Sequence, residues 1–176
     1  FKKEALNKNP LIKFTRRFKQ SMEYEKEVFK RNSSTEVFLL NNKQANDFKD
    51  VYQLNPHLMT LIPPGIDLNW NDHEPIEIHN LFKIPPEDRV ALFVGSDFSR
   101  KGLDRAISSI HFLNTSHIPF TLLVIGKDNF GPFSELVDKL GLNEKIKFLG
   151  PRDDVASIMK SSDLLLHPAR EEAAGN

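Results

Sequence analysis

The chain has 176 residues, room for one domain or parts of two, with equal numbers of acidic and basic side chains and no cysteine. A formal net charge of zero argues against a protein that binds nucleic acid through its overall charge, and the lack of cysteine excludes disulfides and disfavours structural zinc. No apolar run approaches the length of a membrane span, so we expect a cytoplasmic protein. Because the first residue is phenylalanine and not methionine, we also expect an internal part of a longer protein.

The first twenty residues carry an excess of positive charge. Seven lysines and arginines oppose Glu4 alone, a local balance of +6. At helical spacing, one face holds Leu11, Phe14, Phe18, Met22 and Phe29. A helix that packs this stripe on its own domain would explain the apolar face but not the charge. We therefore expect the segment also to contact an anionic membrane surface, through Lys13, Arg16, Arg17 and Lys19.

Short apolar runs alternate with helical patterns through the rest of the chain. Two runs, 35–40 and 59–67, flank a helix expected around 44–51 and form a strand–helix–strand unit. The polar, proline-containing stretch that follows, up to residue 88, indicates a linker or the irregular start of a domain. Four further runs lack period-two alternation, which is typical of strands buried on both faces of a parallel sheet: 89–95, 120–126, 146–150 and 163–168. This order predicts an α/β fold with doubly wound parallel sheets.

The turn after the first of these four strands, VGSDFSRKG at 94–102, is dense in backbone N–H groups and positive charge. Gly95 stands at the strand end, where open α/β sheets bind ligands, and a helix is expected from about Gly102. A helix N-terminus attracts phosphate, and Arg100 and Lys101 add full charges. A solvated turn with a surface Arg-Lys pair is the alternative interpretation of the same residues. The stretch is neither a dinucleotide fingerprint nor a Walker A loop.

The ends of the other three strands also place glycine, charge or both at the same edge of the sheet, in VIGKD, FLGPRDD and LHPAREEAAG. Four such ends favour a ligand site over a solvated turn. Together with PPGID at 63–67, and in this order and spacing, the motifs resemble those of the retaining nucleotide-sugar glycosyltransferases with two facing Rossmann-like domains. Within that family, the resemblance is greatest to the lipopolysaccharide core glucosyltransferases, and it covers nearly the whole chain.

The resemblance implies a division of the chain. Residues 1–66 would be the C-terminal part of the acceptor-side domain, with the basic amphipathic helix. Residues 67–88 would be a linker or lead-in segment. Residues 89–176 would form the first half of the nucleotide-sugar-binding domain. The stretch 1–176 alone would be inactive, because the acceptor-side loop and the second carboxylate of the family motif fall outside it.

The catalytic roles that the resemblance implies fall on Lys101, Arg100 and Glu172. The two cations would bind the donor's diphosphate and neutralise the charge that develops as the nucleoside diphosphate leaves. Glu172 would be the first carboxylate of the family's Glu–seven residues–Glu motif and would contact the hydroxyls of the donor sugar. The implied donor-binding set further includes residues near the sugar phosphate, the uracil and the sugar: Gly95, Ser96, Leu149, Gly150, Arg152, His167 and Gly175. Arg152 has a plainer alternative, an ion pair with a neighbouring aspartate.

As a member of this family, the chain would take part in moving a hexose, glucose by preference, from a UDP-sugar to an inner-core heptose of lipopolysaccharide with retention of configuration. Its expected partners are the UDP-sugar donor, a lipid-linked core oligosaccharide acceptor and the anionic surface of the inner membrane, to which the protein would be peripheral. No nucleic acid, metal or further cofactor is expected. A non-catalytic nucleotide-binding or scaffold module on the same fold stays open as the alternative.

Overall fold

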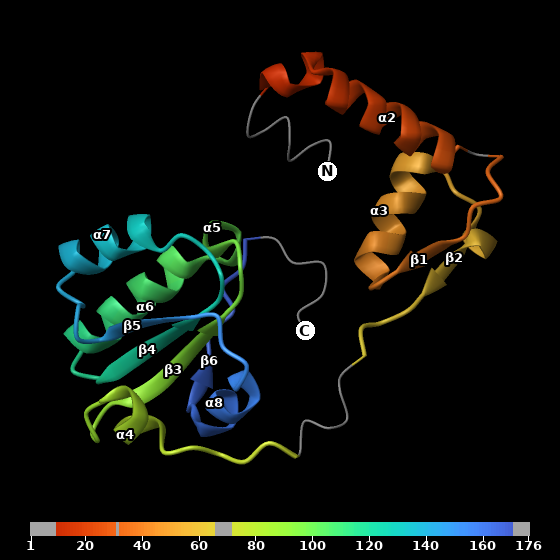
Figure 1. Cartoon of the computed structure of the whole chain (residues 1–176). Helices are drawn as coiled ribbons and strands as arrows, with labels where there is room; N and C mark the ends of the chain where they lie inside the picture. Colours follow the sequence, from red (N-terminus) through yellow and green to blue (C-terminus); the bar gives the residue numbers. More distant parts are fainter. Residues whose placement is uncertain (1–9, 31, 66–71, 171–176) are drawn as a thin grey trace. The chain divides into compact units, whose positions relative to one another are not determined.

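The computed structural model describes residues 10–30, 32–65 and 72–170 (Figure 1). The chain forms two compact units and passes from one to the other after residue 66. Each unit has a parallel sheet of its own. Over the described residues, we find no helix that combines the length and the apolar character needed to cross a bilayer.

The first unit is a strand–helix–strand motif preceded by a helix. β1 (Val37–Leu39) and β2 (Met59–Leu61) pair in parallel, and α3 (Asn42–Tyr52) is the crossover between them. These three elements confirm the strands and the helix predicted from the apolar runs. Among the described residues, the other elements of this unit are the 3₁₀ helix η1 (Pro10–Phe14), α2 (Arg16–Val28) and the 3₁₀ helix η2 (Pro56–Leu58).

The single helix that the apolar spacing predicts over the first thirty residues is instead two segments. Thr15 separates η1 from α2, and its hydroxyl accepts the Phe18 N–H at 3.2 Å as the N-cap of α2. Phe18 is buried and Met22 is half-buried, as a packing stripe requires. Leu11 and Phe14, which lie in η1, are 69% and 66% exposed. The packed part of the apolar stripe therefore begins at Phe18 in α2, because the cap at Thr15 starts a new helix there.

Aromatic contacts join α2 to α3. The ring of Phe29, which follows α2, packs edge-on against Phe48 with centroids 5.1 Å apart, and it lies 4.9 Å from the ring of Tyr52. The Tyr52 hydroxyl donates a hydrogen bond to the carboxylate of Glu25. Burial, helped by this hydrogen bond and by the negative charge of Glu25, raises the pKa of Tyr52 to about 12. The basic helix is thus fixed to its own unit.

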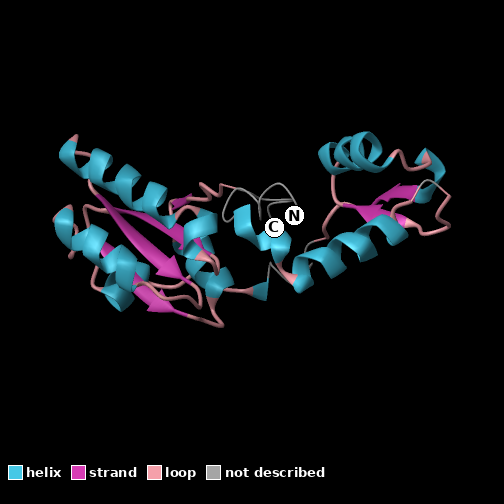
Figure 2. Ribbon diagram, turned by 90° about the horizontal axis from the view of Figure 1, so that it is seen from above, coloured by secondary structure: helices cyan, strands magenta, loops and turns pink. Residues whose placement is uncertain are grey.

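Within residues 72–170, the second unit is a parallel sheet in the order β5-β4-β3-β6 with helices on both faces (Figures 1 and 2). Its strands are β3 (Arg89–Val94), β4 (Phe120–Ile125), β5 (Ile146–Gly150) and β6 (Leu164–Leu165). Its helices are α4 (Ile78–Phe82), α5 (Phe98–Lys101), α6 (Leu103–Thr115), α7 (Gly131–Lys139) and α8 (Val155–Ser161). The predicted α/β class with doubly wound parallel sheets is confirmed.

Successive residues of the central strands face opposite sides of the sheet and build two cores. Ala91 and Phe93 of β3 pack with residues of α5, α6 and α7. Val90 and Leu92 of the same strand pack with residues of α4 and α8 on the other face. The central strands are therefore buried on both faces, which explains their unbroken apolar runs.

The polar stretch before β3, expected as a linker or lead-in segment, contributes to this second unit. It contains α4, and its Ile78 and Ile84 are buried against the sheet. These isolated apolar residues between prolines and charges gave no periodic signal in the sequence. The part of this stretch from residue 72 onward therefore packs as part of the second unit.

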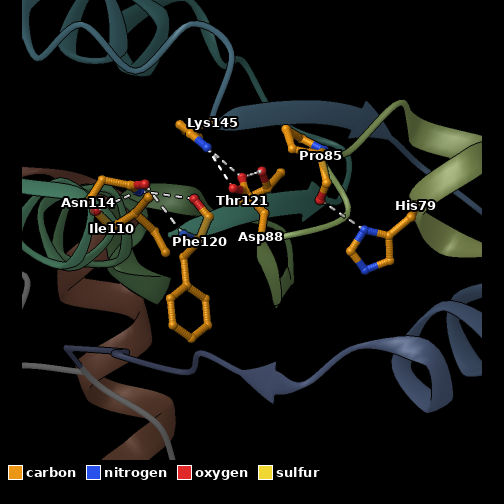
Figure 3. A network of polar contacts seen from close by, with 8 residues as sticks. All are labelled: His79, Pro85, Asp88, Ile110, Asn114, Phe120, Thr121 and Lys145. Carbon is orange, nitrogen blue, oxygen red and sulfur yellow. Dashed lines mark hydrogen bonds and ion pairs between the residues drawn. The ribbon is translucent and has the colours of Figure 1, made fainter. Parts of the chain in front are cut away.

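A buried polar network closes the amino-terminal edge of the second sheet (Figure 3). The side chain of Asp88, just before β3, has no exposed surface. Its carboxylate accepts a hydrogen bond from the Thr121 hydroxyl at 2.6 Å. The Lys145 ammonium donates to both carboxylate oxygens, each at 2.7 Å. Beside it, the Asn114 side chain of α6 donates to the carbonyl of Phe120 at 3.0 Å. The starts of β3, β4 and β5 are thereby tied together, and the opposite edge carries the predicted site.

Candidate functional site

The chain reverses its direction across the second sheet beside β3. From β3 it moves through α6 to β4 and through α7 to β5, and α8 then returns it to β6 on the other side of β3. In open α/β sheets, ligands bind beyond the carboxyl ends of the strands at such a switch point. The centre of the candidate site is therefore formed by the exits of β3 and β6, residues 95–102 and 166–170.

The β3 exit contains a short helix with a sharp end. Asp97, with φ of 57°, is the N-cap of α5, and its carboxylate accepts the Arg100 N–H at 3.3 Å. Gly102, with φ of 78°, ends α5 and begins α6. A helix does begin near Gly102 as predicted. However, Arg100 and Lys101 lie in the last turn of α5 and not ahead of the first helix after β3. The left-handed backbone conformations of Asp97 and Gly102 make residues 98–101 a separate short helix.

Arg100 and Lys101 are positioned by different neighbours. The Lys101 stem lies across Gly95, where an added Cβ would come within 3.3 Å of Lys101 Cγ. Glycine at the strand end thus leaves room for the lysine. Arg100 Nε lies 3.1 Å from the Asp97 carboxylate at the surface. A phosphate bound at this turn would compete with Asp97 for Arg100.

The exits of β3, β4 and β5 interlock. The Gly126 N–H donates to the Gly150 carbonyl at 3.0 Å, and a Cβ on Gly126 would overlap the carbonyl oxygen of Gly95. Only glycine at 126 allows this approach of the two backbones. The Asp128 carboxylate, beyond β4, accepts the Phe98 N–H of α5 at 2.7 Å. The loops at this edge therefore fix one another.

Arg152, beyond β5, is held between a carboxylate and an aromatic ring. Its Nε and Nη2 each donate to Asp154 at 2.7 Å, and its guanidinium carbon lies 5.4 Å from the ring centre of Phe82. These hydrogen bonds raise the pKa of Arg152 and lower that of Asp154. The plainer alternative, a pair with a neighbouring aspartate, is thus present. Because 31% of the Arg152 side chain is still exposed, a contact with uracil stays a prediction.

The β6 exit folds back onto the turn between α5 and α6. Arg170 Nη1 donates to the Ser99 carbonyl at 2.6 Å and to Asp104 Oδ1 at 2.9 Å, while Nη2 donates to Asp104 Oδ2 at 2.6 Å. The Arg170 main-chain N–H donates to the Arg100 carbonyl at 2.9 Å. The side-chain hydrogen bonds with Arg170 lower the pKa of Asp104 and raise that of Arg170.

The other predicted donor residues lie at these exits or outside the described residues. Ser96 is exposed between β3 and α5, and His167 is exposed after β6. Leu149 and Gly150 end β5, where Leu149 packs against the second core. The last two predicted residues lie outside the described part of the chain: Glu172 and Gly175. Across the described residues, no group of three or more His, Asp or Glu side chains is arranged to hold a metal ion.

Sequence reasoning missed three residues that shape this edge. Asp97 carries a local signal, since an aspartate just ahead of a helix is a common N-cap. Asp128 and Arg170 carry none, because their partners lie 30 and 66 to 71 positions away in the chain. Only the fold brings them to the turn.

A family model described as glycosyl transferases group 1 matches residues 76–176, more than half of the chain. The chain belongs to the group 1 glycosyl transferases. The matched stretch includes the exits of all four strands of the second sheet. The glycines and charges at this edge therefore lie in the part of the chain that matches the family.

A curated relative extends this likeness to the first unit. The lipopolysaccharide glucosyltransferase WaaG of Escherichia coli K12 is 38% identical over 98% of this chain and 48% of that protein. The 2-deoxystreptamine glucosyltransferase of Streptomyces kanamyceticus is 28% identical over 67% of this chain and 32% of that protein. The chain spans about half the length, or less, of these relatives.

Solved structures share the fold. The crystal structure of WaaG, a glycosyltransferase involved in lipopolysaccharide biosynthesis, superposes with a TM-score of 0.82 at 34% identity and covers 98% of this chain and 49% of that chain. Anabaena Alr3699/HepE in complex with UDP-glucose gives a TM-score of 0.67 at 19% identity, with 81% and 40% coverage, which is a likeness of fold alone. The resemblance to glycosyltransferases with two Rossmann-like domains is confirmed.

Proposed function

We propose that this chain is part of a retaining hexosyltransferase that moves glucose from UDP-glucose to an inner-core heptose of lipopolysaccharide. The observation that carries the proposal is the 38% identity to a lipopolysaccharide glucosyltransferase over 98% of the chain, through both units. A second relative is also named a glucosyltransferase, which supports glucose as the hexose. The second unit would bind the donor, and the first would belong to the acceptor-side domain.

The chemistry follows from the charge that the reaction produces. The bond between the sugar's anomeric carbon and the diphosphate oxygen breaks, and negative charge builds on the leaving diphosphate. The oxygen of the acceptor hydroxyl bonds to the anomeric carbon, and its proton passes to the leaving diphosphate. Cations that are already in position stabilise such charge most effectively. Lys101 and Arg100 lie on a turn whose main chain is fixed by Asp97 and Asp128, so the backbone of the turn would need little rearrangement to bring both cations to the diphosphate. Glu172 would hold the sugar hydroxyls.

We further propose that the enzyme is cytoplasmic and peripheral to the inner membrane, where a lipid-linked acceptor would lie. Leu11 and Phe14 expose large apolar side chains on η1. Exposed basic residues lie on the same segment and on the start of α2: Lys13, Arg16, Arg17 and Lys19. Apolar side chains that insert and cations that attract anionic lipid together suit binding to a membrane surface.

The function is tested with the purified full-length protein and lipopolysaccharide that lacks its core glucose. UDP-glucose, UDP-galactose and UDP-N-acetylglucosamine are offered in turn, and the products are weighed by mass spectrometry. We expect one hexose to be added from UDP-glucose, and nuclear magnetic resonance should show the anomeric configuration of the donor in the product.

The possible outcomes separate the parts of the proposal. A product with inverted configuration contradicts retention but keeps the donor assignment. Binding of UDP without transfer to any acceptor supports the non-catalytic module instead. Transfer to lipopolysaccharide that lacks the inner-core heptose contradicts the assignment of that heptose as the acceptor.

A further inference from the structure

Arg170 links two strand exits that lie far apart in the sequence. It follows β6, yet its hydrogen bonds go to the turn after β3. The carbonyl groups in the last turn of a helix have no partner within that helix. In α5, two such carbonyls receive Arg170: its Nη1 reaches Ser99 at 2.6 Å, and its main-chain N–H reaches Arg100 at 2.9 Å. Arg170 thus binds the carbonyls of the two residues that precede Lys101, the last residue of α5.

The guanidinium is itself held from the other side of the turn. Asp104, in the first turn of α6, binds Nη1 and Nη2 with one carboxylate oxygen each, at 2.9 and 2.6 Å. The planar fork of an arginine makes these bonds and the bond to Ser99 together, which an ammonium group would not do. Arg170 therefore clamps the end of α5 to the start of α6, and Lys101, the last residue of α5, lies in the chain between the residues that Arg170 binds.

The same loop also presses on Gly102, the residue between the two helices. A Cβ on Gly102 would overlap the carbonyl oxygen of Pro168, and Arg105 Nη1 donates to that oxygen at 3.3 Å. The α5–α6 turn therefore cannot shift without moving the β6 exit.

We propose that Arg170 is a positioning residue of the donor site, which holds the α5–α6 turn in the geometry in which Lys101 meets the donor's diphosphate. This inference rests on the proposed function and adds a residue that acts on the donor through the turn. Displacing a bound group by about 1 Å is enough to lower a rate about a hundredfold. Loss of the clamp should therefore weaken donor binding and turnover while the fold is kept, since the pair lies at the surface with about 40% of each side chain exposed.

The test compares Arg170→Ala, Arg170→Lys, Asp104→Asn and the double variant Arg170→Ala with Asp104→Asn in the full-length protein. Lys30→Gln, which breaks the surface pair with Glu27, is the matched control. The readouts are the Kd for UDP by calorimetry, kcat and KM with UDP-glucose, and the melting temperature. We expect Arg170→Ala to raise the Kd about tenfold and to lower kcat ten- to a hundredfold, with melting within about 2 °C of the unsubstituted protein.

Two comparisons with Arg170→Ala decide the inference. Arg170→Lys should stay impaired although it keeps the charge, and the double variant should be no worse than Arg170→Ala, because both substitutions break one clamp. If Arg170→Ala melts early, Asp104→Asn carries the same test. Unchanged Kd and kcat in a folded Arg170→Ala, or additive effects in the double variant, overturn the inference alone. If the unsubstituted protein does not bind UDP, the proposed function fails and this inference fails with it.

Discussion

Replacing Lys145 by methionine should lower the stability of the second unit by weakening the amino-terminal edge of its sheet. Asp88 is wholly buried, and its carboxylate accepts hydrogen bonds from Lys145 and from the Thr121 hydroxyl. In Lys145→Met, the buried Asp88 carboxylate loses its cation and keeps the hydrogen bond from the Thr121 hydroxyl. Removing one partner of a buried ion pair costs about 3–5 kcal/mol. Because 27% of the Lys145 side chain is exposed, water would reach the vacated position, and we expect a loss at the low end, about 3 kcal/mol.

Hydrogen exchange read by mass spectrometry measures this loss in the second unit within the whole protein. Peptides that cover β3 and β4 should exchange about a hundredfold faster, since each 1.4 kcal/mol is about a factor of ten. Asp88→Asn is the matched control, because it leaves Lys145 as a cation that reaches water, and we expect it to cost about 1 kcal/mol. The double variant should resemble Asp88→Asn and not the sum of both.

Two results would refute this reasoning. One is an exchange rate in Lys145→Met that equals that of the unsubstituted protein, which would mean that the carboxylate needs no cation. The other is an equal loss in Lys145→Met and Asp88→Asn, which would mean that the two charges are equally exposed to water.

Three further predictions concern other parts of the chain. The fraction of full-length protein that co-sediments with vesicles should rise with anionic lipid and fall with salt. Each basic residue contributes roughly 1 kcal/mol to binding an anionic surface, so the partition coefficient should fall about a hundredfold when three of them become glutamine: Arg16, Arg17 and Lys19. Equal binding to neutral vesicles contradicts this. The tyrosinate absorbance of Tyr52, identified as the part that is missing in Tyr52→Phe, should titrate with a midpoint near 12 and not near 10. Because folding raises the pKa of Tyr52, the stability that its neutral phenol supplies is present below about pH 10 and is lost as the pH rises toward 12. Gly126→Ala should force the β3 and β4 exits apart and cost about 1–3 kcal/mol in urea unfolding, and a cost near zero would disprove the close approach to Gly95.

The central strands could be predicted from the sequence because burial on both faces leaves unbroken apolar runs. β3 and β4 have that pattern, and both lie where the runs place them. β6 was expected over 163–168, but it is only two residues long, Leu164 and Leu165. An apolar run marks residues that avoid water, whereas strand length is set by the pairing partner, which here is β3 over two residues. The extent of this short strand is therefore not encoded locally.

The candidate site was predictable in its position and not in its internal contacts. Glycine and charge at each strand end indicate the ligand edge, because parallel strands share one carboxyl edge. The pairing of Arg152 with Asp154 spans two residues and was open to sequence reasoning as an alternative. The clamp by Arg170 was not, since Asp104 lies 66 residues away. The same holds for the buried network of Asp88, whose partners begin the next two strands.

The central claim, that the α5–α6 turn receives the donor's diphosphate, is tested most directly by the turnover of the full-length protein with Lys101→Ala and UDP-glucose. Losing one preorganised group that meets developing charge lowers kcat about a hundredfold or more. We expect that loss in Lys101→Ala and none in Lys139→Ala, which removes an exposed lysine at the end of α7. Turnover in Lys101→Ala within about twofold of the unsubstituted enzyme would contradict the account, since the scale expected for such a group is far larger.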